Sequence, residues 1–223
     1  MQLAKLFTGK TDRGLTDRMN PLFIVIEGLD GSGGTTQSRL LQDWFLEKGH
    51  ATHLTCEPSH RPVGVFLQQQ LKASSQETRL SDRVLPFLFA ADRQDHLDEE
   101  INPALLAGKM VISDRYYHSS LAYQGLSIGL SRVASLNENF RKPDITFILW
   151  LDPEISFQRI QHRGLPLERF ETLNHLRNIA EAYEDVFSYC KTQGERIFKI
   201  DARLSIEEIH QSIQKHIQEH FTV

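Results

Sequence analysis

A short apolar run followed by a glycine-rich loop, at residues 23–37, constrains this chain more than any other segment. Its sequence is FIVIEGLDGSGGTTQ. The first four residues are mostly β-branched and apolar, which predicts a strand buried on both faces of a parallel sheet. The residues after the loop have apolar positions at helical spacing, at Leu40, Leu41, Trp44 and Phe45. A strand, a glycine loop and a helix start in this order predict an α/β fold with an anion site at the loop.

The loop nearly matches a phosphate-binding pattern, which is a glycine, four residues, a second glycine, a lysine and then serine or threonine. Gly28, Gly33 and Thr35 occupy their places, but Gly34 stands where the lysine belongs. Backbone N–H groups of such a loop converge on phosphate oxygens. The predicted phosphate-binding residues are Gly28, Gly31, Ser32, Gly33, Gly34, Thr35 and Thr36. The pattern therefore predicts a nucleoside triphosphate site without its usual cation.

The composition is that of an ordinary folded domain. Of the 223 residues, 40% are hydrophobic and 24% charged, which is enough for one sizeable α/β core. A net charge of −4 lacks the basic field of nucleic-acid binders, and no apolar run approaches the ~18 residues that span a bilayer. Cys56 and Cys190 are too few for a disulfide framework or a metal site. We predict a cytoplasmic protein that binds neither nucleic acid nor membrane.

Residues 1–19 differ in character from the rest of the chain. They are too polar for a secretory signal peptide, and we interpret them as a flexible extension, with Met19 as a second candidate start. Residues 20–223 predict a single domain, because no linker, repeat or low-complexity block divides them.

Five apolar strand candidates alternate with helical patterns. They are residues 22–27, 51–56, 109–113, 145–151 and 196–200. The segments between them are long enough for crossover helices, which predicts a mainly parallel sheet. Ligand sites in such sheets lie at the carboxyl ends of the strands. Polar residues with useful chemistry follow these strands: Asp30, Glu57, Asp114, Arg115 and Asp152.

Asp114 and Arg115 follow the third strand candidate and extend the predicted site. An aspartate there can hold magnesium opposite the Thr35 hydroxyl, so Thr35 and Asp114 are the predicted metal residues. Arg115 presents a fixed fork of donors that suits phosphate oxygens. A plain surface ion pair or helix cap is the alternative interpretation of these two residues.

The segment 81–107 predicts a long helix, with Ser81 as its N-cap and with possible kinks at Pro86 and Pro103. Phe89 and Arg93 are four residues apart and share one face of it. A phenyl ring and a guanidinium together can hold a planar base by stacking and hydrogen bonding. The alternative is that Phe89 belongs to the hydrophobic core.

Several segments together resemble bacterial members of the thymidylate kinase family. They are FIVIEGLDGSGGTTQ, CEP at 56–58, FAADRQDH at 89–96, ISDRYYHSSLAYQG at 112–125 and IDARLSIEEIHQSI at 200–213. The resemblance covers roughly residues 20–220. It implies a P-loop NTPase-type three-layer fold, with a five-stranded parallel sheet flanked by helices, in one nucleoside monophosphate kinase domain. It also implies ATP-dependent phosphorylation of dTMP to dTDP with Mg²⁺, and a homodimer.

The resemblance implies a role for individual residues. Asp30 would receive the sugar 3′-hydroxyl, Phe89 would stack on thymine and Arg93 would bind its O4. Arg115 would grip the acceptor phosphate, and residues 201–205 would border the adenine. The full set implied for dTMP is Asp30, Glu57, Phe89, Arg93, Arg115, Ser119, Ser120, Tyr123 and Gln124. The set implied for catalysis is Arg115, Asp114, Arg163 and Arg169.

Arg163 and Arg169 belong to a predicted lid at about residues 160–171. A glycine- and proline-containing loop with arginines can close over the donor and exclude water. In family members without an arginine in the phosphate loop, lid arginines supply charge to the transferring group, and Arg159 is a third candidate here. A solvated polar loop is the alternative interpretation.

Several positions depart from the family pattern. Gly34 replaces the lysine, Cys56 replaces an arginine, and Ser59-His60-Arg61 replaces a glycine pair. Either another cation takes the place of the lysine, or the chain is a catalytically impaired nucleotide-binding homologue. A deoxynucleoside kinase with Glu57 as base is a further alternative. A switch GTPase ranks last because an Asn-Lys-x-Asp sequence is absent.

Overall fold

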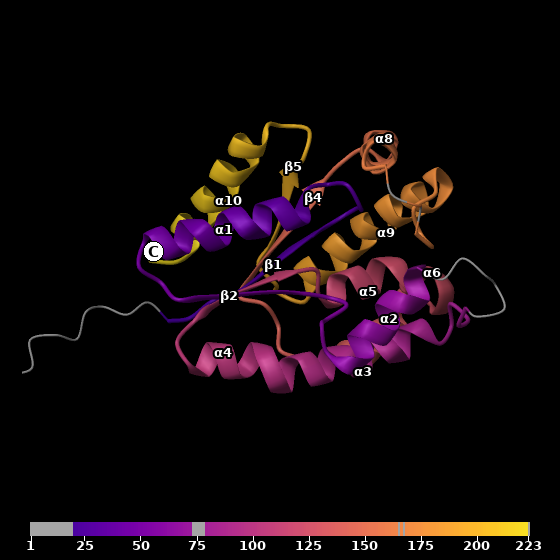
Figure 1. Ribbon diagram of the computed structural model, residues 1–223, viewed down its shortest axis with the longest axis horizontal. Helices are drawn as coiled ribbons and strands as arrows, with labels where there is room; N and C mark the ends of the chain where they lie inside the picture. Colours follow the sequence, from indigo (N-terminus) through magenta and orange to yellow (C-terminus); the bar gives the residue numbers. More distant parts are fainter. Residues whose placement is uncertain (1–19, 73–78, 165, 167, 223) are drawn as a thin grey trace, which may run out of the picture.

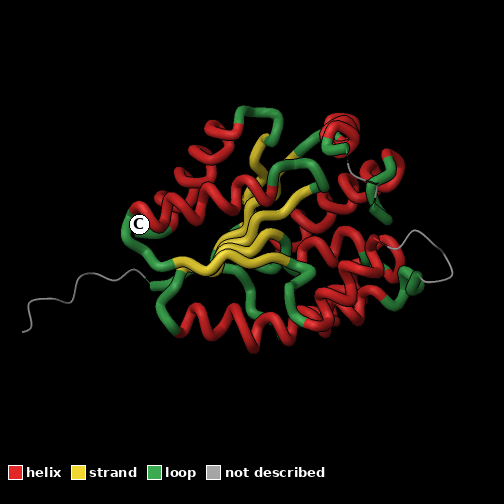
Figure 2. Tube along the Cα trace, viewed as in Figure 1, coloured by secondary structure: helices red, strands yellow, loops and turns green. Residues whose placement is uncertain are grey.

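One parallel sheet forms the centre of the computed structural model, which describes residues 20–72, 79–164, 166 and 168–222. Its strands are β1 (Phe23–Gly28), β2 (Thr52–Cys56), β3 (Met110–Asp114), β4 (Ile145–Trp150) and β5 (Ile197–Asp201). The spatial order is β2-β3-β1-β4-β5, and every neighbouring pair is parallel. Figure 2 shows the strands, in yellow, side by side between the helices. Each strand begins and ends within one residue of its predicted range, so the predicted α/β fold is confirmed.

Helices cover both faces of the sheet and complete three layers (Figure 1). On one face lie α1 (Gly34–Glu47) and α10 (Ile206–His220). The other face is covered by α4 (Asn102–Leu106), α5 (Tyr117–Tyr123) and α9 (Leu173–Thr192). The remaining helices are α2 (Pro62–Lys72), α3 (Leu85–His96), α6 (Gly125–Ile128), α7 (Leu130–Asn137) and α8 (Pro153–His162).

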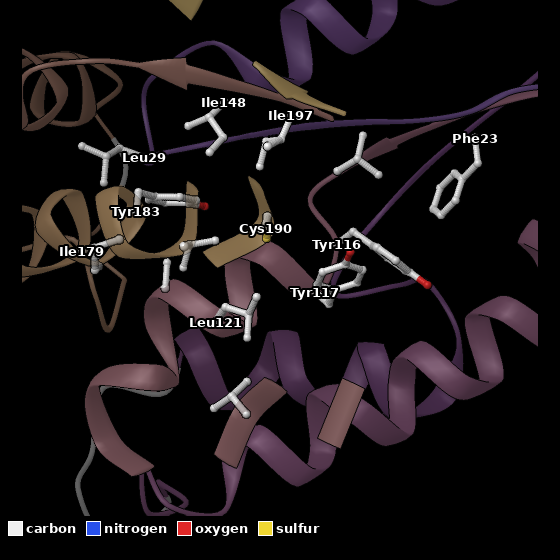
Figure 3. Close-up of a cluster of buried hydrophobic side chains, with 14 of the residues drawn as sticks. Phe23, Leu29, Tyr116, Tyr117, Leu121, Ile148, Ile179, Tyr183, Cys190 and Ile197 are labelled. Carbon is white, nitrogen blue, oxygen red and sulfur yellow. The ribbon is translucent and has the colours of Figure 1, made fainter. Parts of the chain in front are cut away.

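The core is divided by the sheet because successive side chains of each strand point to opposite faces. Phe23 and Val25 of β1 pack on the side of α5 and α9, in a cluster that also contains Tyr116, Tyr117, Tyr183 and Cys190 (Figure 3). Ile24 and Ile26 pack on the side of α1 and α10, with Leu41, Phe45 and Ile213. All six residues of β1 are buried, so the central strand is covered on both faces, as its sequence predicts.

The prediction for residues 81–107 needs correction at its start. The helix begins at Leu85, and the Ser81 hydroxyl accepts the N–H of Arg83 at 3.2 Å in a turn before it. Pro86 lies in the first helical turn, where its missing N–H has no intrahelical role. Further along, a π-helical turn, η2 (Leu97–Ile101), precedes Pro103. Pro103 has no N–H for the preceding turn, which favours the wider winding there.

The predicted extension 1–19, with Met19, lies outside the described residues. Within the described ranges, none of the helices combines the length and the apolar character needed to cross a membrane.

Candidate active site

The glycine loop joins β1 to α1 in the geometry that an anion site requires. Gly33 has a left-handed φ of 99°, which an L-residue rarely adopts, and α1 begins at the next residue. The Ser32 N–H donates to the Leu29 carbonyl at 3.1 Å and tightens the loop. The unpaired N–H groups at the start of α1 therefore face the carboxyl edge of the sheet, where phosphates bind.

Gly34 lies directly beside the last residue of β3. A Cβ atom added at Gly34 would lie 2.8 Å from Oδ1 of Asp114, and the Thr35 hydroxyl donates to Oδ2 of Asp114 at 2.6 Å. The two predicted metal residues are therefore in contact. Burial raises the pKa of Asp114, and Arg115 and the Thr35 hydroxyl oppose the shift only in part. A carboxylate short of positive charge beside a hydroxyl oxygen is a donor set that suits a hard divalent cation.

Arg115 turns from the end of β3 toward the phosphate loop. Its φ is 75°, and it is the one described non-glycine residue with a positive φ. Its Nη2 donates to Oδ1 of Asp30 at 2.7 Å, and its Nη1 donates to the Ser119 hydroxyl at 3.0 Å. The guanidinium also lies 5.3 Å from the centre of the Tyr123 ring. A strained backbone that aims an arginine into a cavity is typical of a functional position.

A cavity beside Arg115 brings the predicted acceptor residues together. Its volume is about 140 Å³, or about 660 Å³ when the open space at its mouth is counted. Its walls come from the phosphate loop, the end of β2, α3 and α5. All nine residues predicted for dTMP line it: Asp30, Glu57, Phe89, Arg93, Arg115, Ser119, Ser120, Tyr123 and Gln124. Their individual roles stay predictions, but their placement around one cavity agrees with a nucleotide site.

A buried ion pair fixes the base of this cavity. Arg93 is 1% exposed and donates through Nε to Glu57 at 3.0 Å. Its other nitrogens donate to Asn137 and Ser120, and His96 lies 3.3 Å from the same Glu57 carboxylate. The Glu57 side chain is thus already engaged by two partners. Sequence reasoning gave no role to Asn137, since α7 carries no motif, or to His96, although His96 is the last residue of the FAADRQDH segment.

Replacing Arg93 with alanine is expected to lower the free energy of unfolding by about 3–5 kcal/mol, because Glu57 would remain buried without its main partner. Urea unfolding followed by circular dichroism measures the change. Arg132→Ala serves as the control, since Arg132 is exposed and should change stability by no more than about 0.5 kcal/mol. A loss below about 1 kcal/mol for Arg93→Ala would contradict a structural role for this pair.

Residues after β2 that depart from the family pattern are anchored to α3. Ser59 donates its N–H and hydroxyl to Asp92, and Arg61 donates to Asp95 at 2.9 Å. Cys56 stays half-buried, and burial raises the pKa of its thiol to about 11. Side-chain bonds to α3 therefore hold this segment in place at the edge of the cavity.

The lid residues lie against the acceptor cavity. Arg169 lines it, donates to the Leu80 carbonyl at 2.8 Å and pairs with Asp82. Arg163 is paired with Glu171 through two contacts of 2.7 and 2.9 Å. Positions 165 and 167 of the predicted lid lie outside the described residues. The structure thus places both predicted catalytic arginines of the lid in ion pairs and does not bring them to the phosphate loop.

Arg159, the third candidate, does reach the phosphate loop. It lies on α8, and its guanidinium donates to the Gly31 carbonyl at 3.4 Å and to the Ala202 carbonyl at 3.1 Å. The Ser156 hydroxyl, one helical turn earlier, donates to the Asp30 carbonyl at 2.6 Å. Helix α8 therefore packs on the loop, and Arg159 links it to the predicted adenine segment 201–205. Within the described part of the chain, the side-chain nitrogens of Arg159 contact carbonyls and no carboxylate.

Comparison with known proteins agrees with this arrangement. Residues 26–213 match the family model described as thymidylate kinase. A probable thymidylate kinase of Thermococcus kodakarensis is 37% identical over 201 residues, covering 86% of this chain and 95% of the relative. A putative thymidylate kinase of Treponema pallidum is 35% identical over 89% of this chain and 95% of the relative. A thymidylate kinase of Trichormus variabilis is 31% identical, with 91% and 98% covered. The chain therefore belongs to the thymidylate kinase family.

Proposed function

We propose that this protein transfers the γ-phosphoryl group of ATP to dTMP, giving dTDP and ADP. The observation that carries the proposal is the shared position of two half-sites at the carboxyl edge of the sheet. A glycine loop for donor phosphates and a cavity lined by Phe89, Arg93 and Arg115 meet at Asp30. The relatives named thymidylate kinase support the same reaction.

In the acceptor cavity, Phe89 stacks on the thymine ring and Arg93 binds its O4. Ser119 and Ser120 lie along the base, and Gln124 completes the wall beside the sugar. Asp30 receives the sugar 3′-hydroxyl, and Tyr123, whose hydroxyl lies 3.3 Å from Asp30, packs against the deoxyribose. Arg115 binds the acceptor phosphate. No general base is needed, because the attacking phosphate oxygen is already an anion.

In the donor half, the loop from Gly28 to Thr36 binds the phosphates of ATP through backbone N–H groups, and residues 201–205 border the adenine. We infer that Thr35 and Asp114 hold Mg²⁺, since a hard oxygen donor pair is present at the loop. Magnesium bound there neutralises negative charge on the phosphates. The protein residues position the phosphates of ATP on one side and the acceptor phosphate of dTMP on the other.

The positive charge missing at Gly34 needs another source. Loss of one well-placed donor typically lowers the rate by about 10²–10³-fold. We propose that Arg159 supplies this charge, since it already contacts the loop and pairs with carbonyls alone in the described residues. Arg163 and Arg169 stay candidates, but each must first leave its carboxylate partner. A homologue that binds nucleotides without turnover is the alternative if none of these arginines acts.

We also propose a homodimer in the cytoplasm. Helices α2 and α3, together with the residue just before α3, present exposed apolar side chains, among them Val65, Phe66, Val84 and Phe87. Such a patch is typical of a protein–protein contact.

The reaction is tested by ADP release with a panel of acceptors at fixed ATP and Mg²⁺. We expect turnover with dTMP, none with thymidine, and loss of turnover when EDTA removes the metal. Phosphorylation of thymidine instead would indicate a deoxynucleoside kinase. Calorimetric binding of dTMP and ATP without any ADP release would indicate the impaired homologue and would contradict the proposed catalysis.

A further inference from the structure

Beneath the acceptor cavity, five side chains of alternating charge run from the active site to the surface. They are, in order, Arg115, Glu27, His118, Glu195 and Lys142. His118 Nε2 lies 3.0 Å from Oε2 of Glu195, and its Nδ1 lies 3.7 Å from Oε1 of Glu27. Lys142 lies 3.7 Å from the far oxygen of Glu195. Each buried charge in this row therefore has an opposite charge on either side.

Glu27 connects the row to the active site. Its carboxylate, which is inaccessible to solvent, accepts the backbone N–H groups of Tyr116 and Ser119 at 2.8 and 3.2 Å. It also accepts the Ser119 hydroxyl at 2.6 Å, and that hydroxyl in turn accepts Nη1 of Arg115 at 3.0 Å. Tyr183 of α9 donates to the same carboxylate. A side chain of β1 thus caps α5, which carries much of the acceptor cavity.

His118 is enclosed by groups from every element packed around it. Glu27 faces it from β1, Cys190 from α9 and Glu195 from the segment after α9, and the Tyr117 ring stacks on it at 4.1 Å. Figure 3 shows Tyr117 on the α5 side and Cys190 on the facing helix α9. His118 is fully buried, and its Nδ1 has no hydrogen-bond partner within the usual distance in the described residues. A buried nitrogen aimed at a carboxylate needs a proton.

The charges of this cluster support the same protonation. Burial on its own lowers the pKa of His118, but Cys190, Glu195 and Glu27 outweigh it and raise the pKa well above its ordinary value. Burial on its own raises the pKa of Glu27, but His118 and Arg115 outweigh it and lower the pKa. The positive form of His118 is therefore present at neutral pH and lost only as the pH rises through this raised pKa.

We propose that His118 is a positioning residue whose doubly protonated ring holds the Glu27 carboxylate in place, and with it Ser119 and Arg115, for the acceptor phosphate. The inference rests on the proposed function for its effect on dTMP; for the state of the ring it rests on the geometry and charges around His118, and needs no substrate. His118 itself touches neither substrate. Its role is to keep the carboxylate under α5 in the orientation that Arg115 requires.

The same cluster could instead hold a metal ion in place of the ring proton. His118, Cys190 and Glu195 each offer one ligand atom, and these three atoms lie within 4.8 Å of one another. A ring protonated on both nitrogens cannot ligate a metal. The two states are therefore mutually exclusive, and elemental analysis of the purified protein distinguishes them.

Nitrogen-15 NMR of the unmodified protein tests the ring without any substrate. We expect both ring nitrogens of His118 to carry slowly exchanging protons at pH 8, and zinc to be present at far below one equivalent. A neutral tautomer of His118 at pH 8, or stoichiometric zinc bound to it, would overturn the proposal. This measurement remains decisive even where a variant fails to fold or where dTMP is not the acceptor.

Calorimetry of the His118→Gln variant tests the positioning role, with His210→Gln as control, because His210 is a half-buried histidine on the distant helix α10. We expect dTMP binding to weaken at least about tenfold, as for loss of a charge-assisted partner. ATP binding should change less than about twofold, since this row meets the phosphate loop through Arg115 and the side chain of Asp30, and that side chain lines the acceptor cavity. Affinity of the unmodified protein for dTMP should fall at high pH, and the variant should lack that fall. Equal weakening of both ligands, or unchanged dTMP affinity, would refute the role.

Discussion

Arg115→Ala is expected to lower kcat/KM for dTMP by about 10³-fold, the largest effect of any single substitution proposed for this chain. Among the arginines of the described residues, only Arg115 both contacts the phosphate loop, through Asp30, and lines the acceptor cavity. Its removal leaves the acceptor phosphate without a bidentate partner and leaves the Asp30 carboxylate unpaired beside it. Steady-state ADP release over a range of dTMP concentrations measures the loss.

The matched control is Arg132→Ala, which removes an exposed arginine from α7, outside the acceptor cavity. Its kcat/KM should stay within about twofold of the unmodified protein. Circular dichroism and the unfolding midpoint establish that the Arg115 variant is folded. If the folded Arg115 variant keeps more than about a tenth of the activity, the assignment of Arg115 to the acceptor phosphate is wrong.

Arg159→Ala is expected to lower kcat by about 10²–10³-fold, and Gly34→Lys is expected to restore much of that loss in the same chain. The lysine would return a cation to the place in the loop where the family carries one. On its own, Gly34→Lys should bring little gain, or a loss, because its Cβ would lie 2.8 Å from Oδ1 of Asp114 and that carboxylate would have to rotate. A double-mutant cycle on kcat measures the coupling between the two positions.

The same cycle with Arg163→Ala in place of Arg159→Ala is the control. Arg163 is paired with Glu171 and does not contact the phosphate loop. Gly34→Lys should therefore not restore any kcat that the Arg163→Ala variant loses. Rescue of Arg163→Ala and not of Arg159→Ala would move the compensating charge to the lid. A large gain from Gly34→Lys alone would instead mean that nothing compensates, and that the chain as it stands is impaired.

The fold could be predicted from sequence because its strands are short, apolar and buried on both faces. Runs such as Phe23–Ile26 and Phe147–Trp150 are continuously apolar and do not alternate with polar residues, so a central place in a parallel sheet was the consistent solution. The residues of the acceptor cavity could also be predicted from sequence in large part, because most of those that line it fall in segments with family motifs. Distance along the chain did not matter once the strand ends were known to meet at one edge.

Other features depend on contacts that no local pattern encodes. Ser81 has the chemistry of an N-cap, yet the helix begins at Leu85, where Pro86 in the first turn sets the boundary. The partners of Arg93 on α7 and of Glu27 on α5 are set by packing between helices far apart in sequence. The pairing of Arg163 with Glu171 is likewise a contact between residues eight positions apart that no motif marks.

The central place of β1 in the sheet has a consequence for synthesis on the ribosome. Its neighbours are β3 and β4, with Ile24 paired to Ile112 on one side and to Ile145 on the other. More than 100 further residues must therefore be synthesised before both edges of the strand that leads into the phosphate loop can be paired. Until then an apolar strand with a free edge is exposed to other chains, which is the condition that favours aggregation and chaperone binding. The nascent chain acquires its nucleotide site late, after β4 has emerged.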